Sequence, residues 1–217
     1  HWKDNGQGES TRTDNPITCT GINGERSVGT VAELVAAIDE GVKKIWITAS
    51  FVMSGTEITI GSGKNVNIVG AVDGGAGSGG GKGQPTIDAD FKSRHFYVSP
   101  GGTLELDNVR LINGKASNGG SISNEGGTLV VRESRLESNE ATISGSGGGG
   151  AIYTDSGGTT NIISTLLAAN KAPNGYGGAV HMNSGVLALS NASFTGNTAS
   201  GSGKDIYIYS SSSSNFL

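Results

Sequence analysis

The sequence predicts an all-β protein, a right-handed parallel β-helix of about seven coils, with an α-helix near residues 30–40 sealing its N-terminal end. Two observations lead to this fold. A glycine-containing motif recurs along the chain with three short strands in each copy. One amphipathic helical segment precedes all of these copies. In such a solenoid each coil buries its inward side chains on the coils above and below it.

Composition limits the classes of function that the chain can serve. Glycine accounts for 38 of the 217 residues, charged residues for 16%, and the formal net charge is −4. A nucleic-acid-binding domain usually carries a basic face, so we expect no nucleic acid partner. The apolar runs are far shorter than the ~18 residues that a transmembrane helix needs, so we expect no transmembrane segment.

The N-terminal part of the chain is predicted to cap the solenoid. Residues 1–26 are polar and aperiodic, and they are expected to form an irregular arm or cap. In the capping-helix region, 27–41, Thr30 and Glu33 have the spacing of a capping box, and Gly41 ends the helix. The apolar residues of this segment fall on one helical face: Val31, Leu34, Val35 and Ile38.

Residues 42–209 are predicted to form the coils of one domain that spans 1–217, and residues 210–217 to form a flexible tail. A Gly-Gly-(Ala/Ser)-(Ile/Val) motif begins at Gly119 and recurs after 30 and then 28 residues. The glycine pairs permit sharp corners, and they are Gly119, Gly120, Gly149, Gly150, Gly177 and Gly178. An asparagine closes each copy and is expected to stack its amide on the next: Asn139, Asn170 and Asn197.

Several stretches resemble a known superfamily. The segment from Thr30 to Gly70, with KKIWITASF and TEITIGSGKNVNIVGA, resembles the start of pectate-lyase-like right-handed β-helix proteins. RHFYVSPGGTLELDNVRLING, the GG-(A/S)-(I/V) motif and the (L/F)-x-x-N motif resemble the repeats of polymorphic outer membrane proteins. The resemblance covers roughly residues 28–209. It implies the fold and leaves the function open, because this superfamily includes adhesins, polysaccharide lyases, epimerases and hydrolases.

One outward-facing column carries the best candidates for chemistry. Tyr153 and His181 are expected to be neighbours, about 4.8 Å apart along the coil axis, and such a pair can abstract and return a proton on a sugar ring carbon. Glu125, Asp155 and Asn183 form the neighbouring candidate binding column, whose carboxylates can raise each other's pKa or hold Ca²⁺. No other cofactor or metal is predicted. Alternatively, these three residues are turn formers and Tyr153 is a surface aromatic.

Two further motifs are weaker. Arg94 and His95 follow Asp88 and Asp90, and these residue types together can make an acid–base site. The resemblance to the repeat family implies instead that they are structural. Asn191 begins an Asn-Ala-Ser sequon, which is a glycosylation acceptor if the protein is secreted by a eukaryote.

Three functions follow from these observations. The leading prediction is a secreted or surface-displayed, non-catalytic module that binds carbohydrate, matrix or an extracellular protein. The first alternative is a polysaccharide lyase, epimerase or hydrolase that uses Tyr153 and His181. The second is a structural subunit of an extracellular assembly, joined through the ends of the coils. Whether the protein is an enzyme is therefore left open, and the sequence favours a non-catalytic role.

Overall fold

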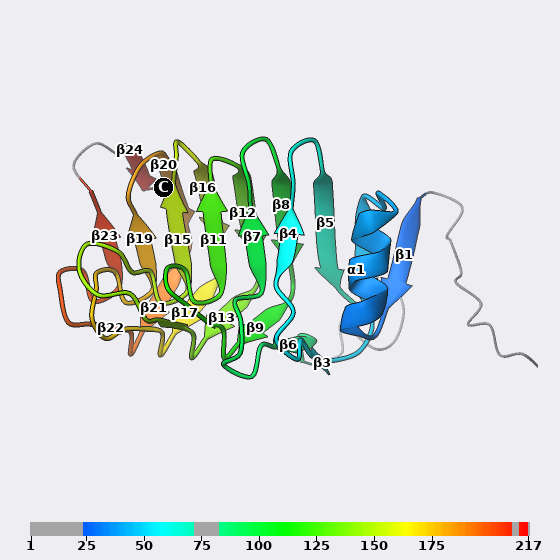
Figure 1. Ribbon diagram of the computed structural model, residues 1–217, viewed down its shortest axis with the longest axis horizontal. Helices are drawn as coiled ribbons and strands as arrows, with labels where there is room; N and C mark the ends of the chain where they lie inside the picture. The colour runs from blue at the N-terminus through cyan, green and yellow to red at the C-terminus, as the bar shows by residue number, and fades with distance from the viewer. Residues whose placement is uncertain (1–23, 72–82, 210–212, 217) are drawn as a thin grey trace, which may run out of the picture.

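A computed structural model describes residues 24–71, 83–209 and 213–216. It shows a nearly all-β protein, a parallel β-solenoid of about six turns with a single helix near one end (Figure 1). The predicted arm over residues 1–23 lies outside the described residues. Within the described part of the chain, no helix is long and apolar enough to cross a membrane.

Four parallel sheets form the walls of the solenoid. Sheet A contains β1 (Glu25–Val28), β2 (Lys44–Ile47), β5 (Asn65–Gly70), β8 (Thr103–Asp107), β12 (Thr128–Arg132), β16 (Thr159–Ile163), β20 (Val186–Ser190) and β24 (Ser213–Phe216). Sheet B contains β3 (Phe51–Val52), β6 (Thr86–Asp88), β9 (Arg110–Ile112), β13 (Arg135–Glu137), β17 (Leu166–Ala168) and β21 (Ser193–Thr195).

The other two sheets complete each coil. Sheet C contains β4 (Ile58–Ile60), β7 (Phe96–Val98), β11 (Ile122–Glu125), β15 (Ile152–Asp155), β19 (Val180–Met182) and β23 (Ile206–Ile208). The short sheet D contains β10 (Lys115–Ala116), β14 (Glu140–Ala141), β18 (Lys171–Ala172) and β22 (Thr198–Ala199). The chain therefore passes through sheets C, A and B in turn, and from β10 onward it also passes through sheet D.

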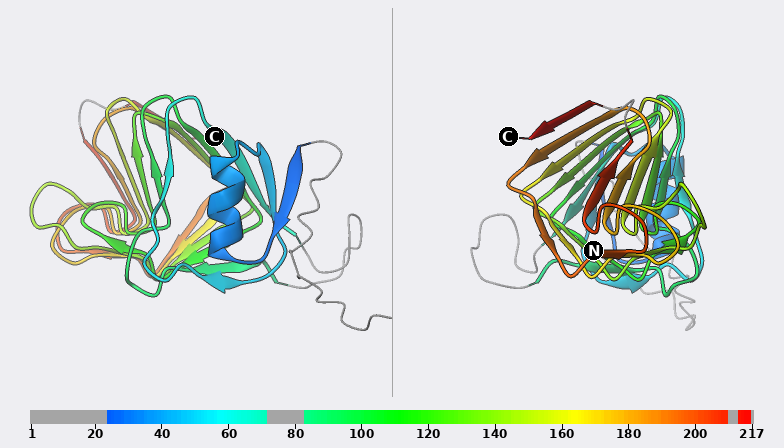
Figure 2. Two further views of the ribbon diagram at one scale, coloured as in Figure 1. Left: turned by 45° about the vertical axis from the view of Figure 1, so that its right-hand side comes forward. Right: turned by 90° about the vertical axis from the view of Figure 1, so that its left-hand side faces the viewer.

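The direction of the strands shows the handedness of the solenoid. In Figure 1 the strands of sheet C run upward on the near side, those of sheet A run downward behind them, and the chain advances from right to left. This is a right-handed coil, as predicted. Seen along its axis, the solenoid has a three-sided cross-section (Figure 2, right).

The number of coils is lower than the predicted seven. Sheets B and C have six strands each, which corresponds to about six turns. The count of seven was too high because residues 42–209, at the observed repeat steps of 28 and 30 residues, hold about six coils. The segment before them contains β1 and the helix α1 (Val31–Asp39), and β1 pairs directly with β2.

Two predicted boundaries also change. Residues 25 and 26 were assigned to the irregular arm, but they belong to β1. Residues 213–216 were assigned to the flexible tail, but they form β24, which pairs in parallel with β20. In both places, hydrogen bonds to a neighbouring strand satisfy backbone N–H and C=O groups. In an irregular segment these groups would bond to water instead.

The capping helix forms as the sequence predicts. The Thr30 side chain accepts a hydrogen bond from the Glu33 amide, and the Glu33 carboxylate accepts one from the Thr30 amide at 3.1 Å. Leu34, Ala37 and Ile38 are buried against the first coil. The helix therefore covers apolar surface at this end of the solenoid, where an open coil would invite pairing with another chain.

The predicted register of the coils is confirmed. Leu129 pairs with Thr160, which pairs with Leu187, and all three side chains point into the solenoid and are fully buried. Ile122 pairs with Ile152, which pairs with Val180 in the same way in sheet C. The core is thus a set of stacked layers, one layer for each coil.

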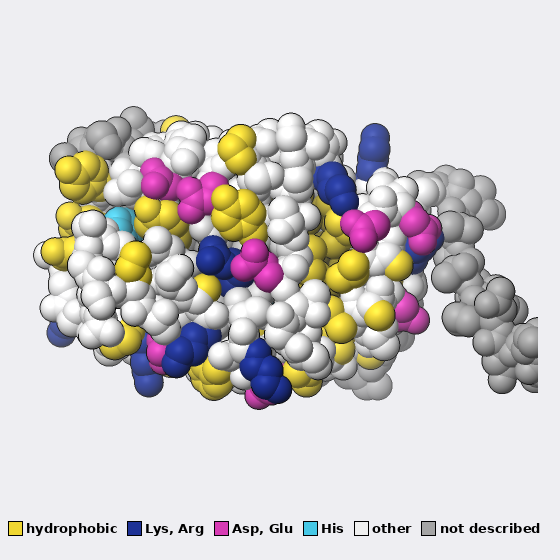
Figure 3. All heavy atoms as spheres, in the orientation of Figure 1, with side chains coloured by type: hydrophobic (Ala, Val, Ile, Leu, Met, Phe, Trp, Pro, Cys, Tyr) yellow, Lys and Arg dark blue, Asp and Glu magenta, His cyan; other side chains and the backbone are white. Residues whose placement is uncertain are grey.

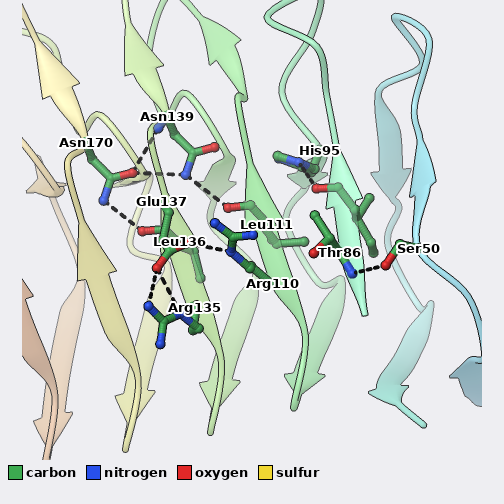
Figure 4. Close-up of polar contacts among 11 residues, drawn as sticks. Ser50, Thr86, His95, Arg110, Leu111, Arg135, Leu136, Glu137, Asn139 and Asn170 are labelled. Carbon is green, nitrogen blue, oxygen red and sulfur yellow. Dashed lines mark hydrogen bonds and ion pairs between the residues drawn. The ribbon is translucent and has the colours of Figure 1, made fainter. Parts of the chain in front are cut away.

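The corner between sheets B and D repeats with little change. In each of four successive coils it has two residues, of which the first has a positive φ of 54° to 64°: Asn113, Ser138, Ala169 and Gly196. In the last three of these coils the second residue is a buried asparagine. Asn139 Nδ2 donates to Asn170 Oδ1 at 2.9 Å (Figure 4). Asn170 Nδ2 donates in turn to Asn197 Oδ1 at 3.0 Å. The predicted amide stack is therefore a hydrogen-bonded ladder.

The glycine pairs are required by close approach between coils. Gly149 has a φ of +70°, which a side chain disfavours. A Cβ added to Gly150 would lie 2.2 Å from the Gly178 carbonyl oxygen. The repeated motif therefore keeps adjacent coils in contact at the entry to sheet C.

Substitution of Gly150 by alanine should destabilise the fold. The new Cβ would meet backbone rather than a flexible side chain, so we expect a loss of about 3 kcal/mol or more in the free energy of unfolding. Denaturant unfolding measures this loss. Gly61→Ala is the control, because no atom lies within 4 Å of its added Cβ. Equal stability of the two variants would contradict the close packing of the coils.

Removal of the central ladder amide should also be costly. Asn170→Ala leaves the Asn139 amide N–H and the Leu136 carbonyl without their partners, so we expect a loss of about 3 kcal/mol. The matched control is Asn65→Ala, since Asn65 is exposed and its loss should change stability by less than about 0.5 kcal/mol. A small effect at Asn170 would show that the amides do not hold the coils together.

Candidate functional site

The structure brings together the predicted column on sheet C. Ser123 pairs with Tyr153, and Tyr153 pairs with His181. The column also extends further than the sequence indicated, because Tyr97 precedes Ser123 and Tyr207 follows His181 in the same register. Alignment of the strands before and after the three glycine-motif copies with those copies could have predicted this extension.

Tyr153 and His181 are not at the surface, and this corrects the prediction of a surface site. Tyr97 and Tyr207, in the same column, are half-buried. His181 is fully buried, and Tyr153 is only 7% exposed. The ring of His181 lies edge-to-face with Tyr153 at 5.2 Å, with Tyr207 at 5.1 Å and with Tyr176 at 6.4 Å between ring centroids. Tyr176, on the segment before β19, thus completes an enclosure that register alone does not reveal.

The electrostatics of this pair do not suit proton transfer at neutral pH. Burial lowers the pKa of His181, against smaller opposing effects of the nearby Gly147 backbone and the Asp155 carboxylate. Neither ring nitrogen makes a hydrogen bond of good geometry. Burial, together with the hydrogen bond to Asp155, raises the pKa of Tyr153 far above its usual value. The histidine is therefore neutral and enclosed, and the phenol keeps its proton.

The predicted binding column is in register, but it is largely committed to local hydrogen bonds. Asp155 lies opposite Glu125 and accepts hydrogen bonds from the Tyr153 hydroxyl at 3.0 Å and the Ser184 hydroxyl at 2.8 Å. Burial tends to raise the pKa of Asp155, but these bonds and others from Ser156 and Asn183 outweigh it and lower the pKa. The Asp155 carboxylate therefore stabilises the turn after β15 through local hydrogen bonds.

Glu125 is in a similar position, since its carboxylate accepts a hydrogen bond from the Ser123 hydroxyl at 3.0 Å. Acidic and hydrophobic side chains lie next to each other on the face that sheet C presents (Figure 3). Among the described residues, no group of three or more His, Cys, Asp or Glu side chains is placed to hold a metal ion. Ca²⁺ binding stays a prediction from the sequence.

The second histidine cluster is structural. His95 is fully buried, with its Nε2 bonded to the Ile87 carbonyl at 3.0 Å and its Nδ1 to the Ser121 hydroxyl at 3.0 Å. Burial lowers the pKa of His95 to about 4. Arg94 points elsewhere and forms an ion pair with Glu57 at 2.9 Å. These residues therefore do not form a shared acid–base site.

Sheet B carries an ion-pair network that sequence analysis missed. Arg110 and Arg135 lie in register on neighbouring strands, and both contact the carboxylate of Glu137 (Figure 4). The two guanidinium groups lower the pKa of Glu137, although burial alone would raise it. Charge pairs of this kind, partly exposed to water, add little to stability and serve mainly to satisfy neighbouring charges.

A hollow at the corner between sheets B and D was also missed. It has a volume of about 280 Å³ and takes side chains from four successive coils. Its lining consists of Phe91, Asn113, Ser138, Glu140, Ala169 and Lys171. Phe91 is 48% exposed, which is unusual for a large apolar side chain in this protein. No signal in the sequence indicated this hollow, because the exposure of Phe91 is known only from the structure.

The sequon residue Asn191 is exposed, and its side-chain amide donates to the Ser164 hydroxyl at 3.3 Å. It lies between β20 and β21, at an outer corner of a coil. A glycan at this position would extend into solvent. Glycosylation of Asn191 stays a prediction.

Comparisons with protein-family models, with curated proteins and with solved structures found no match for the chain. The fold therefore rests on the structure itself. The resemblance of individual motifs to pectate-lyase-like and polymorphic outer membrane proteins is carried by the sequence alone.

The two buried histidines predict a loss of stability in weak acid. The folded-state pKa of His95 lies below its ordinary value of 6.5, so its contribution is complete above pH 6.5 and is lost as the pH falls toward 4. We expect His95 to lower the free energy of unfolding by about 2 kcal/mol between pH 7 and pH 5. His181 acts in the same direction.

Denaturant unfolding across this pH range measures the effect, before most carboxylates titrate. NMR titration of the His95 imidazole in the folded protein provides an independent check. A level stability profile, or an imidazole that titrates near its ordinary pKa, would contradict the buried, neutral state of His95.

Proposed function

We propose that the protein is a secreted or surface-displayed, non-catalytic β-helix module that binds carbohydrate, matrix or an extracellular protein partner. We further propose that it belongs to the pectate-lyase-like superfamily, with repeats of the kind found in polymorphic outer membrane proteins. The motifs that support this membership lie on the glycine and asparagine corners, which are the parts of the repeat that the coil geometry constrains most.

The corner hollow is the observation that carries the binding function. It crosses four successive coils, so an elongated ligand lying along the solenoid axis would contact several of them. It places an exposed aromatic side chain beside polar and charged groups that can fix the orientation of a ligand. By contrast, the groups that the sequence offered for catalysis are enclosed in an aromatic cluster.

The enzymatic alternative has less support for a physical reason. A general base must reach the proton that it removes, and it needs a pKa near the working pH. His181 is fully buried, and the pKa of Tyr153 is raised. A sugar-cleaving activity of the predicted kind would require the Tyr176 and Tyr207 rings to move away first.

Assembly through a coil end is a second candidate, and one observation favours it. Phe194, Ile206 and Ile208 pack on the core but are only partly buried. They lie on β21 and β23, the last described strands of sheets B and C. A further layer of strands stacked on this end would bury them more completely.

A polysaccharide panel, incubated with and without Ca²⁺, tests the proposed function. We expect retention on at least one ligand and no release of reducing ends or unsaturated products. Tyr153→Phe should leave retention unchanged, because the hydroxyl bonds Asp155 rather than a ligand. Product release by the native protein that disappears in Tyr153→Phe would establish the enzymatic alternative and overturn the proposal.

A further inference from the structure

We propose that the hollow between sheets B and D is a subsite for a neutral glycan, in which Phe91 stacks on the face of a sugar ring. This inference rests on the proposed binding function, and it names both the site and the chemical class of its ligand. Four features of the hollow support it: the held position of Phe91, the small side chains of the floor, the opposite charges of one wall and the paired backbone of that wall.

Phe91 is held outward by a strained turn. Asp90 and Phe91 have φ values of 53° and 54°, a conformation that is uncommon for any residue with a side chain and rare for a bulky one. The turn is fixed because Asp88 accepts hydrogen bonds from the Asp90 amide at 2.8 Å and from Asn113 Nδ2 at 3.0 Å. The Phe91 amide donates to the Asn113 carbonyl at 2.7 Å. The same left-handed conformation recurs at the corners of later coils, and here hydrogen bonds hold the turn that carries Phe91.

The floor beyond Phe91 is built from small side chains. Asn113, Ser138 and Ala169 occupy equivalent corner positions of successive coils, and each has the same left-handed backbone conformation. Coils repeat about every 4.8 Å along the axis, so the floor is a regular shelf rather than a deep pit. A chain of sugar rings can lie along it, with its first ring against Phe91.

The charged side chains of one wall are opposite in sign. Glu140 and Lys171 both line the hollow and are in register on neighbouring strands of sheet D. Glu140 also pairs at 2.8 Å with Lys115, which lies in register on the preceding strand. A polyanion would meet the Glu140 carboxylate, and a polycation would meet Lys171. Hydroxyl groups both donate and accept hydrogen bonds, so a neutral, hydroxyl-rich ligand matches this wall best.

The backbone of the wall argues against an extended peptide. Peptides commonly bind by adding a strand to an open sheet edge. Here β14 lies between β10 and β18 and pairs with both. Contacts to a ligand in the hollow must therefore come from side chains, and an aromatic ring beside polar groups is suited to the apolar face and hydroxyl rim of a sugar.

Calorimetric titration with soluble neutral polysaccharides, namely a glucan, a mannan and a galactan, tests the site, with polygalacturonate as the acidic comparison. We expect the native protein to bind a neutral probe and Phe91→Ala to lose about tenfold or more in affinity. Phe91→Trp keeps an aromatic face and should retain binding. Tyr209→Ala is the matched control, because Tyr209 is 50% exposed and follows β23 in sheet C.

Each outcome decides a different question. Neutral-glycan binding that Phe91→Ala leaves intact overturns the site and keeps the proposed function. Binding to polygalacturonate alone overturns the neutral class and also keeps the proposed function. If no polysaccharide binds, this inference is overturned and carbohydrate is removed from the proposed function. Because Phe91 is exposed, Phe91→Ala should fold normally, and its unfolding curve verifies this.

Discussion

Stacked asparagine amides at one corner of the coil are the interaction on which the rest of the structure depends. The Asn139, Asn170 and Asn197 side chains bond to each other and to neighbouring backbone, so these three successive coils must turn at the same place. Once the corners are in register, the flanking strands of sheets B and D pair without adjustment, and the inward side chains form layers. A buried amide ladder tolerates no slip of one residue, because each slip would leave several polar groups unpaired.

The regular stacking of the coils explains why the candidate catalytic side chains on sheet C are enclosed. A departure from that regularity explains why the hollow beside Phe91 is accessible to a ligand. On sheet C, in-register stacking places Tyr153, His181 and Tyr207 one above another, and the rings then exclude water from the histidine. At the corner between sheets B and D, the turn after β6 departs from the two-residue pattern of later coils, and Phe91 is exposed there. Regular coils thus enclose their reactive groups, and the irregular turn leaves a hollow beside an aromatic ring.

Much of the fold could be predicted because repeats report on register directly. The capping box at Thr30 and the column from Ile122 to Val180 follow from spacing alone. Burial of His181 could not be predicted, since it depends on Tyr176, which lies outside the repeated strands. The coil count was one too high because residues 42–209, at repeat steps of 28 and 30 residues, hold only about six coils.

The most direct test of the ladder is hydrogen exchange of the asparagine side-chain amides, followed by NMR. The account predicts slow exchange for Asn139, Asn170 and Asn197, whose Nδ2 groups are buried and bonded, and fast exchange for the exposed Asn65 amide. Exchange of the three corner amides as fast as that of Asn65 would contradict the account, because the coils would then have no common corner to hold them in register.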